Sequence, residues 1–244
     1  MKLSVENAQN VLEKYLKYSN EKKYKHSLEV AKMAEQLAKK WRVNREEAVI
    51  SALLHDIGKS IPTREEMLMF CEEHGIEISE FERDENPEAL HGKISAYLFK
   101  EEFRDGENGE RTNKKTLKRI ARAIESHVAG SKDMDIIAQI VWLADNLKDP
   151  KMIESILNDK RRPGHYIGRI FFRKMKAAIN NNRQPNPDYK CLIPEGSSGK
   201  KRRDLFLEAM RPYKDLAKPQ NLPCMARKAK DGYTYGEGVQ LGEK

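Results

Sequence analysis

Apolar residues recur every three or four positions along most of the first 180 residues, and this helical period constrains the fold more than any other feature. The first segment shows it clearly, because Val5, Ala8, Val11 and Leu12 would share one face of a helix. Alternation of β-branched and polar residues, which is typical of strands, is nearly absent. The sequence therefore predicts an all-α fold with further helices at about 28–41, 44–58, 63–75, 86–98, 113–127, 133–147, 151–158 and 163–180.

The amino-acid composition of the chain changes beyond about residue 182. Stretches 180–187 and 195–199 are rich in Asn, Pro, Gly and Ser, which favour loops. We predict a helical domain over residues 1–182 and a basic, partly irregular C-terminal extension over 183–244, with one short amphipathic helix near 201–213. The formal net charge is −4 over residues 1–159 and +12 over 160–244. A basic end indicates a polyanionic partner or substrate, nucleic acid among them.

Composition excludes several other classes of protein. No apolar run approaches the ~18–20 residues that a bilayer-spanning helix needs, and we expect no membrane contact. The first seven residues lack the apolar core of a secretory signal. The three cysteines, Cys71, Cys191 and Cys224, form no Cys-x-x-Cys pair, which fits a reducing compartment. We expect a cytoplasmic protein, and the sequence leaves a homodimer open.

Four metal-binding side chains lie in or beside apolar helices. His55 and Asp56 follow the apolar run 48–54, Asp145 closes a second such run, and His26 lies near the start of the second helix. Taken singly, each has a structural explanation, such as a helix cap or a partner for a buried lysine. Together they favour a shared cation, because buried imidazoles and carboxylates are costly unless they are paired. Adjacent helical residues diverge by about 100°, so His55 and Asp56 can reach one ion only near a helix end.

The order of these residues carries a family resemblance. His55-Asp56 follows His26 by about thirty residues and precedes Asp145 by about ninety. This pattern resembles the motif of the HD phosphohydrolase superfamily, and residues 55–59, His-Asp-Ile-Gly-Lys, are a specific form of it. The resemblance implies an HD-domain helical bundle and a metal-dependent enzyme.

Two further histidine segments narrow the resemblance. His91-Gly92 and the segment Ser-His-Val-Ala-Gly at 126–130 are similar to segments of the symmetrical bis(5′-nucleosyl)-tetraphosphatases of the YqeK type. The similarity runs from about Tyr24 to Pro150. It implies a nucleotide or dinucleoside polyphosphate substrate, with diadenosine tetraphosphate cleaved to two ADP as the first choice.

Two segments depart from that family. Residues 127–131 read His-Val-Ala-Gly-Ser where the family has His-Thr-Thr-Gly-Arg, and residues 144–150 read Ala-Asp-Asn-Leu-Lys-Asp-Pro where it has Ala-Asp-Tyr-Ile-Glu-Pro-x-Arg. The residues that contact substrate phosphates in the family at these two segments are therefore not assigned to this chain. Two other functions stay open: an HD phosphatase or phosphodiesterase of different nucleotide specificity, and an RNA-binding protein that uses the basic extension.

The predicted primary ligands are His26, His55, Asp56 and Asp145. Two imidazoles and two carboxylates suit a divalent ion such as Fe, Mn, Co or Ni, and the resemblance makes iron the first choice. Such an ion lowers the pKa of a bound water toward neutrality and so supplies a nucleophile.

His91 and His127 have two alternative roles. They ligate a second ion, with Asp56 bridging a binuclear site, or they bind phosphate and protonate the leaving group. Lys59 either meets a substrate phosphate or lies in solvent at a helix end. The expected catalytic residues are therefore Asp56, Lys59, His91 and His127.

The two remaining histidines are assigned structural places. His74 precedes Gly75, where a helix is expected to end, and we predict that it caps that helix. His165 has no ligand-type neighbour in the sequence, and we predict that it is exposed.

Overall fold

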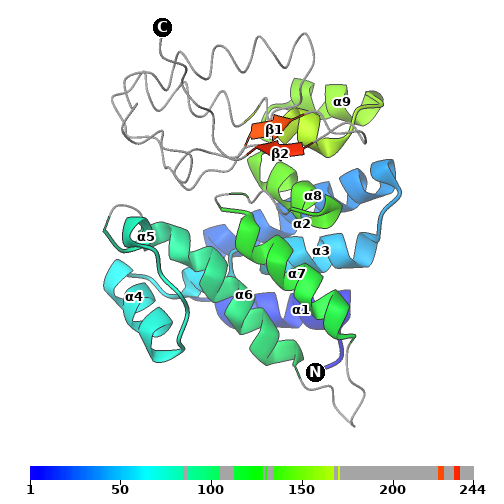
Figure 1. Ribbon diagram of the computed structural model, residues 1–244. Helices are drawn as coiled ribbons and strands as arrows, with labels where there is room; N and C mark the ends of the chain where they lie inside the picture. The colour runs from blue at the N-terminus through cyan, green and yellow to red at the C-terminus, as the bar shows by residue number, and fades with distance from the viewer. Residues whose placement is uncertain are drawn as a thin grey trace, which may run out of the picture. The chain divides into compact units, whose positions relative to one another are not determined.

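Helices make up most of the chain described by this computed structural model, which describes residues 1–84, 87–104, 113–128, 130, 134–167, 170, 225–227 and 234–236. The helices labelled in Figure 1 follow the predicted order along the sequence, except for the short α5, which was not predicted. They are α1 (Val5–Leu12), α2 (Glu21–Trp41), α3 (Arg45–Leu54), α4 (Arg64–Glu73), α5 (Glu80–Asp84), α6 (Leu90–Phe103), α7 (Lys114–Ser126), α8 (Ile136–Asn146) and α9 (Pro150–Asn158).

Three short helical turns complete the described helices. A π-helical turn, Glu13–Lys17, continues α1, and 3₁₀ turns lie at Ile57–Ser60 and Pro87–Ala89. Within the described ranges, no helix combines the length and apolarity needed to cross a bilayer.

The chain divides into two units. The first comprises Met1–Val128 with Met134–Leu157, and the second comprises Ala129–Asp133 with Asn158–Lys244. Every residue of the predicted site belongs to the first unit. The predicted boundary at 182/183 falls outside the described residues and stays a prediction.

The second unit contains secondary structure that the sequence did not predict. Strands β1 (Met225–Arg227) and β2 (Thr234–Gly236) pair antiparallel, with Ala226 opposite Tyr235. The helix predicted from 163 is present over 163–167. Its continuation toward 180, apart from residue 170, and the helix predicted near 201–213 lie outside the described residues.

Helix α3 forms the centre of the first unit. It contacts α1, α2, α7 and α8 (Figure 1), and nearly all of its side chains are buried. A helix that is apolar on most sides is stable only when neighbours surround it. Burial of Ile50, Leu53 and Leu54 contributes about 2 kcal/mol for each side chain.

Helix ends follow the capping residues that the sequence supplies. Thr63 and Glu66 form a reciprocal capping box at the start of α4, as predicted. Asn44 accepts a hydrogen bond from the Glu47 amide at the start of α3. His74 is the C-terminal cap of α4, also as predicted, and its ring stacks on Phe70. The predicted N-cap at Asn86 lies outside the described residues.

Two sequence-based expectations are wrong. α3 ends at Leu54 rather than at Gly58, because the chain turns at Asp56 and continues as the 3₁₀ turn. His165 is 94% buried rather than exposed, since its relative accessibility is 6%. It contacts Arg161, whose guanidinium nitrogen lies 2.7 Å from the His165 Nε2 atom.

A charged pair joins α3 to α7. The guanidinium of Arg119 donates two hydrogen bonds to the carboxylate of Glu47, which is 4% exposed. Bidentate pairing of this kind fixes geometry as well as charge. The pair therefore holds α7, which ends at His127, against the central helix.

Replacing Arg119 with Ala leaves the buried Glu47 carboxylate without its cation. We expect Arg119→Ala to lower the free energy of unfolding by about 2–3 kcal/mol, measured by urea denaturation. Arg122→Ala, an exposed change on the same helix, is the control and should stay within about 0.5 kcal/mol of the wild type. Equal stability of the two variants would contradict the role given to the pair.

Candidate metal centre

The six predicted metal ligands come together from five helices. They are His26 in α2, His55 and Asp56 at the end of α3, His91 in the first turn of α6, His127 at the end of α7, and Asp145 in the last turn of α8. Ligand atoms of His26, His55 and Asp145 lie within 4.8 Å of one another, and so do those of His55, Asp56 and His127. The spatial convergence expected from the sequence is thus present.

The end of α3 makes this convergence possible. His55 keeps helical backbone angles, whereas Asp56 has φ −107° and ψ 8°. The change of direction lets two consecutive side chains face the same point, which an unbroken helix does not allow. This is the helix end that the sequence argument required.

Two glycines allow the helices that carry the ligands to approach closely. A Cβ atom on Gly58 would clash with the carbonyl oxygen of His91, and the Gly58 amide donates to the Ser95 hydroxyl at 2.8 Å. A Cβ atom on Gly92 would lie 2.8 Å from Val128 Cγ2. The first contact positions the turn after Asp56 against α6, and the second brings α6 against the end of α7.

Three of the histidines are oriented by the main chain. The Nδ1 atoms of His55 and His127 lie 2.6 Å from the carbonyl oxygens of Ala52 and Ile124, and His91 Nδ1 contacts the Glu88 carbonyl oxygen. A carbonyl oxygen only accepts, so each Nδ1 carries the hydrogen. The Nε2 atom of each ring is then the one that faces the site.

Asp56 is the hub of the cluster. Its Oδ1 atom lies 3.2 Å from His91 Nε2 and 3.5 Å from His127 Nε2, and its Oδ2 atom lies 3.5 Å from His55 Nε2. One carboxylate therefore faces three imidazoles. At the outer side, His26 Nε2 lies 2.9 Å from Asp145 Oδ1.

Burial divides the site into a floor and a rim. The floor side chains of His55, Asp56, His91 and His127 are at most 8% exposed. The rim side chains of Lys23, His26, Lys59 and Asp145 are 24–30% exposed. A small ligand therefore reaches the site past the rim, while water is largely kept from the floor.

The local charges suit a cation. Burial alone raises the pKa of Asp56, but the neighbouring imidazoles of His55, His127 and His91 outweigh it and hold that pKa well below its ordinary value. Burial likewise opposes ionisation of Asp145, and the hydrogen bond with His26 lowers its pKa. Burial lowers the pKa of His55 to about 4 and also lowers the pKa of His91. Ionised carboxylates beside neutral imidazoles are the forms that bind metals.

Two further observations fit a bound divalent ion. The Nε2 atom of His55 is buried and has no hydrogen-bond partner among the described residues, which is costly unless an ion or proton meets it. The Nε2 atoms of His91 and His127 face each other at 3.1 Å. Two nitrogen lone pairs repel at that distance unless a proton or a cation lies beside them. The donor set of imidazoles and carboxylates thus fits a divalent ion of intermediate hardness.

Sequence reasoning missed one residue of the site. The Nζ atom of Lys23 lies 3.1 Å from Asp56 Oδ2, and that of Lys59 lies 2.8 Å from Asp56 Oδ1. Burial, together with the adjacent Lys23 ammonium, holds the pKa of Lys59 below its ordinary value. The signal for Lys23 was its position three residues before His26, which places both side chains on one face of a helix.

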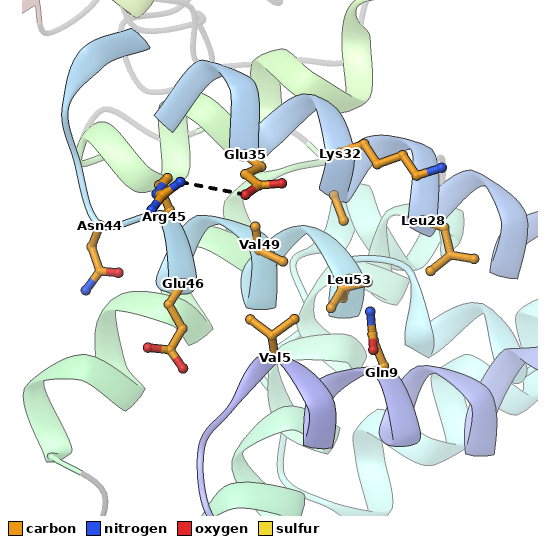
Figure 2. A pocket seen from close by; sticks show the side chains of 11 residues that line it. Val5, Gln9, Leu28, Lys32, Glu35, Asn44, Arg45, Glu46, Val49 and Leu53 are labelled. Carbon is orange, nitrogen blue, oxygen red and sulfur yellow. Dashed lines mark ion pairs between the residues drawn. The ribbon is translucent and has the colours of Figure 1, made fainter. Parts of the chain in front are cut away.

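A separate groove opens on the other side of α2. Its volume is about 610 Å³, and Leu28, Val49 and Leu53 are among its lining residues (Figure 2). Arg45 and Glu35 approach to 4.0 Å at its edge. None of the predicted ligands lines it, so the chemistry-bearing cluster and this groove are distinct.

The comparison with known families decides the assignment. The model of the HD domain matches residues 24–148, which are half of the chain and contain all six predicted ligands. The chain belongs to the HD domain family. The all-α expectation and the family resemblance are both confirmed, and the HD domain coincides with the helices that build the metal centre.

Two curated proteins are similar to about half of this chain. A protein of Mycoplasma genitalium described as a probable nicotinate-nucleotide adenylyltransferase/Ap4A hydrolase is 28% identical over 131 residues, which are 53% of this chain and 33% of that protein. The symmetrical bis(5′-nucleosyl)-tetraphosphatase of Bacillus subtilis is 27% identical over 128 residues, which are 52% of this chain and 62% of that protein. The chain thus spans about a third of one relative and three fifths of the other.

A solved structure supports the fold. A crystal structure from Clostridium acetobutylicum, described as a predicted HD superfamily hydrolase involved in NAD metabolism, superposes with a TM-score of 0.58 at 21% identity. The match covers 83% of this chain and 96% of that one. At this identity the likeness establishes the fold of the HD domain.

The histidine tautomers are directly testable. In protein stripped of metal, we expect protonated Nδ1 atoms on His55, His91 and His127, because each faces a main-chain carbonyl oxygen. His55 Nε2 should stay unprotonated at pH 7, since burial keeps its pKa near 4. Long-range ¹H–¹⁵N correlation spectra report both, with exposed His74 as the internal reference. A protonated His55 Nε2 at pH 7 would contradict the arrangement.

Proposed function

We propose that this HD protein is a metal-dependent phosphohydrolase that acts on nucleotides, and that its substrate is diadenosine tetraphosphate, cleaved symmetrically to two ADP. The observation that carries the proposal is the pairing of a buried His/Asp cluster with two lysines at its open side. The cluster suits a metal ion and the lysines suit phosphate, so the two halves of a phosphohydrolase site lie within a few ångströms.

The primary metal ligands in this proposal are His26, His55, Asp56 and Asp145. When bound, a divalent ion lowers the pKa of a coordinated water and offsets the charge of the phosphoryl group under attack. The chain prepares the site for this ion by presenting His55 Nε2 with its lone pair inward and by keeping both carboxylates ionised. Iron is the first candidate metal, with Mn, Co and Ni as alternatives.

The two lysines supply the phosphate contacts. Lys23 and Lys59 approach opposite oxygens of Asp56 and are partly exposed, so both ammonium groups can turn toward a ligand at the rim. An ammonium group binds phosphate oxygens as a compact charge with three donors. Together they would orient the phosphate chain over the floor.

His91 and His127 have the two roles left open by the sequence. Their Nε2 atoms lie 3.1 Å apart and both face Asp56 Oδ1. If they ligate a second ion, His91 and His127 would hold it together with Asp56, and the site would be binuclear. Otherwise the pair holds a proton at Nε2 that can pass to the leaving phosphate oxygen. The stoichiometry of bound metal separates the two roles.

The choice of substrate draws on the names of the relatives. Both curated relatives carry a function on dinucleoside tetraphosphates in their names, and each matches about half of this chain. Residues 127–131 and 144–150 differ from the motifs of the tetraphosphatase family. An HD phosphatase or phosphodiesterase of different nucleotide specificity is therefore the alternative function. In addition, the +12 net charge of residues 160–244 favours nucleic-acid binding by the extension as a second candidate function.

A substrate panel tests the reaction. The chain of 244 residues loaded with Fe²⁺ or Mn²⁺ should convert diadenosine tetraphosphate to ADP as the sole nucleotide product, read by anion-exchange chromatography. His55→Ala and Asp145→Ala should lose both bound metal and turnover, and the metal content is measured by mass spectrometry. Release of phosphate from mononucleotides instead would point to the alternative specificity, and no turnover with either metal would refute the enzyme.

The lysine pair makes a separate prediction. Lys23→Gln and Lys59→Gln should each lower kcat/KM about 10- to 100-fold, because each removes a charge-assisted contact of about 1.5–3 kcal/mol. Steady-state kinetics on the metal-loaded variants measure this. Lys25→Gln is the matched control, because Lys25 lies on the same helix but pairs with Glu21 at 2.7 Å. A loss of equal size in the Lys25→Gln control would contradict the assignment of Lys23 and Lys59 to the phosphate site.

A further inference from the structure

Helix α7 presents a row of cations that the metal centre does not use. The side chains of Lys114, Lys115, Lys118 and Arg122 are exposed. None of them lies within 4.0 Å of a carboxylate in the part of the chain that the structure describes. The remaining basic residue of the helix, Arg119, is engaged with Glu47.

The row is regular. Lys114, Lys118 and Arg122 are four residues apart, which places them on one face at intervals of about 6 Å along the axis. The opposite face of α7 is apolar and packs into the core through Ile120, Ala121, Ala123 and Ile124. We call the exposed residues Lys114, Lys115, Lys118 and Arg122 the basic face of α7.

The basic face does not stabilise its own helix. Lys114 and Lys115 lie in the first turn, where the helix dipole disfavours positive charge, and α7 has no acidic residue in that turn and no basic residue in the last. Each misplaced cation costs about 0.3–1 kcal/mol when exposed. A row of exposed cations that have no carboxylate partner among the described residues, two of them at the wrong end of the dipole, is explained better by a binding partner than by folding.

The chemistry of the surface selects the partner. An anionic membrane binds helices that expose apolar residues beside their cations, whereas the apolar side chains of α7 are buried or half-buried. A nucleic-acid strand presents phosphates at regular intervals, which a straight row of cations matches. The face holds no aromatic side chain for stacking on bases. Contact with the phosphates alone implies binding without base preference.

We propose that the basic face of α7 binds the phosphodiester backbone of a nucleic-acid strand. The face lies away from the metal centre, because Lys118 and His127 are nine residues apart and so point about 180° from each other around the helix. A bound strand therefore leaves the metal centre open. The proposal is independent of the hydrolase function and of the C-terminal extension.

Salt-dependent binding by the chain of 244 residues tests the proposal. The probe is a fluorescently labelled oligouridine strand, and its binding is followed by anisotropy over a series of KCl concentrations. The variant K114Q/K118Q/R122Q removes the row, and K22Q/K32Q/K39Q removes three exposed lysines of α2 as the matched control. Because each phosphate contact contributes about −0.7 to the slope of log K against log salt, the slope should become shallower by about 2 in the first variant only.

The affinity of the first variant should fall on the order of 100-fold near 0.1 M salt, relative to the wild type and the control. Its melting temperature should not fall, because the three removed side chains are exposed and make no ion pair among the described residues, and Lys118→Gln alone should shift the slope by about 0.7. Identical slopes in all variants would overturn the proposal. The proposal would also be overturned if K114Q/K118Q/R122Q lost binding of inorganic polyphosphate but bound RNA as the wild type does. Nucleotide hydrolysis, assayed in parallel, should be the same in the wild type and both variants.

Discussion

The burial of one carboxylate organises the HD domain. Asp56 is 1% exposed, and a charge at that depth persists only where other groups compensate it. Three imidazoles and two ammonium groups meet its two oxygens, and they come from α2, α3, α6, α7 and the turn after α3. The helices are therefore tied to a single point by electrostatics as well as by their apolar faces.

Close backbone approach is the condition for that arrangement. The turn after Asp56 lies against α6 because Gly58 has no side chain, and α6 lies against the end of α7 because Gly92 has none. The Arg119–Glu47 pair fixes α7 on the central helix from the other side. The chemistry of the site thus depends on packing between helices that are far apart in the sequence. A methyl group at either glycine would push two helices apart and so displace metal ligands that it does not contact.

Features set by neighbouring residues could be predicted from the sequence, whereas features set by contacts between distant segments could not. Helical periodicity located every helix from α1 to α9 except the short α5, and the HD-type order of His26, His55, Asp56 and Asp145 predicted their convergence. Lys23 was missed because it lies among Glu21, Lys22 and Lys25, where charge is typical of a solvated face; only the fold brings it to Asp56. The end of α3 was placed too late, because a contact with α6, 37 residues away, decides it. Strands of three residues carry no alternation long enough to detect.

The anchoring of three histidines by carbonyl oxygens has a wider consequence. In many metal sites a side-chain carboxylate or amide orients each imidazole, so the neighbours of a ligand cannot change freely. Here the acceptors belong to residues 52, 88 and 124 of the main chain, and exchanging those side chains leaves the hydrogen bonds in place. The orientation of the three imidazoles therefore does not depend on the side chains that surround a substrate. Such a scaffold can acquire a new specificity at its rim without rebuilding its inner shell.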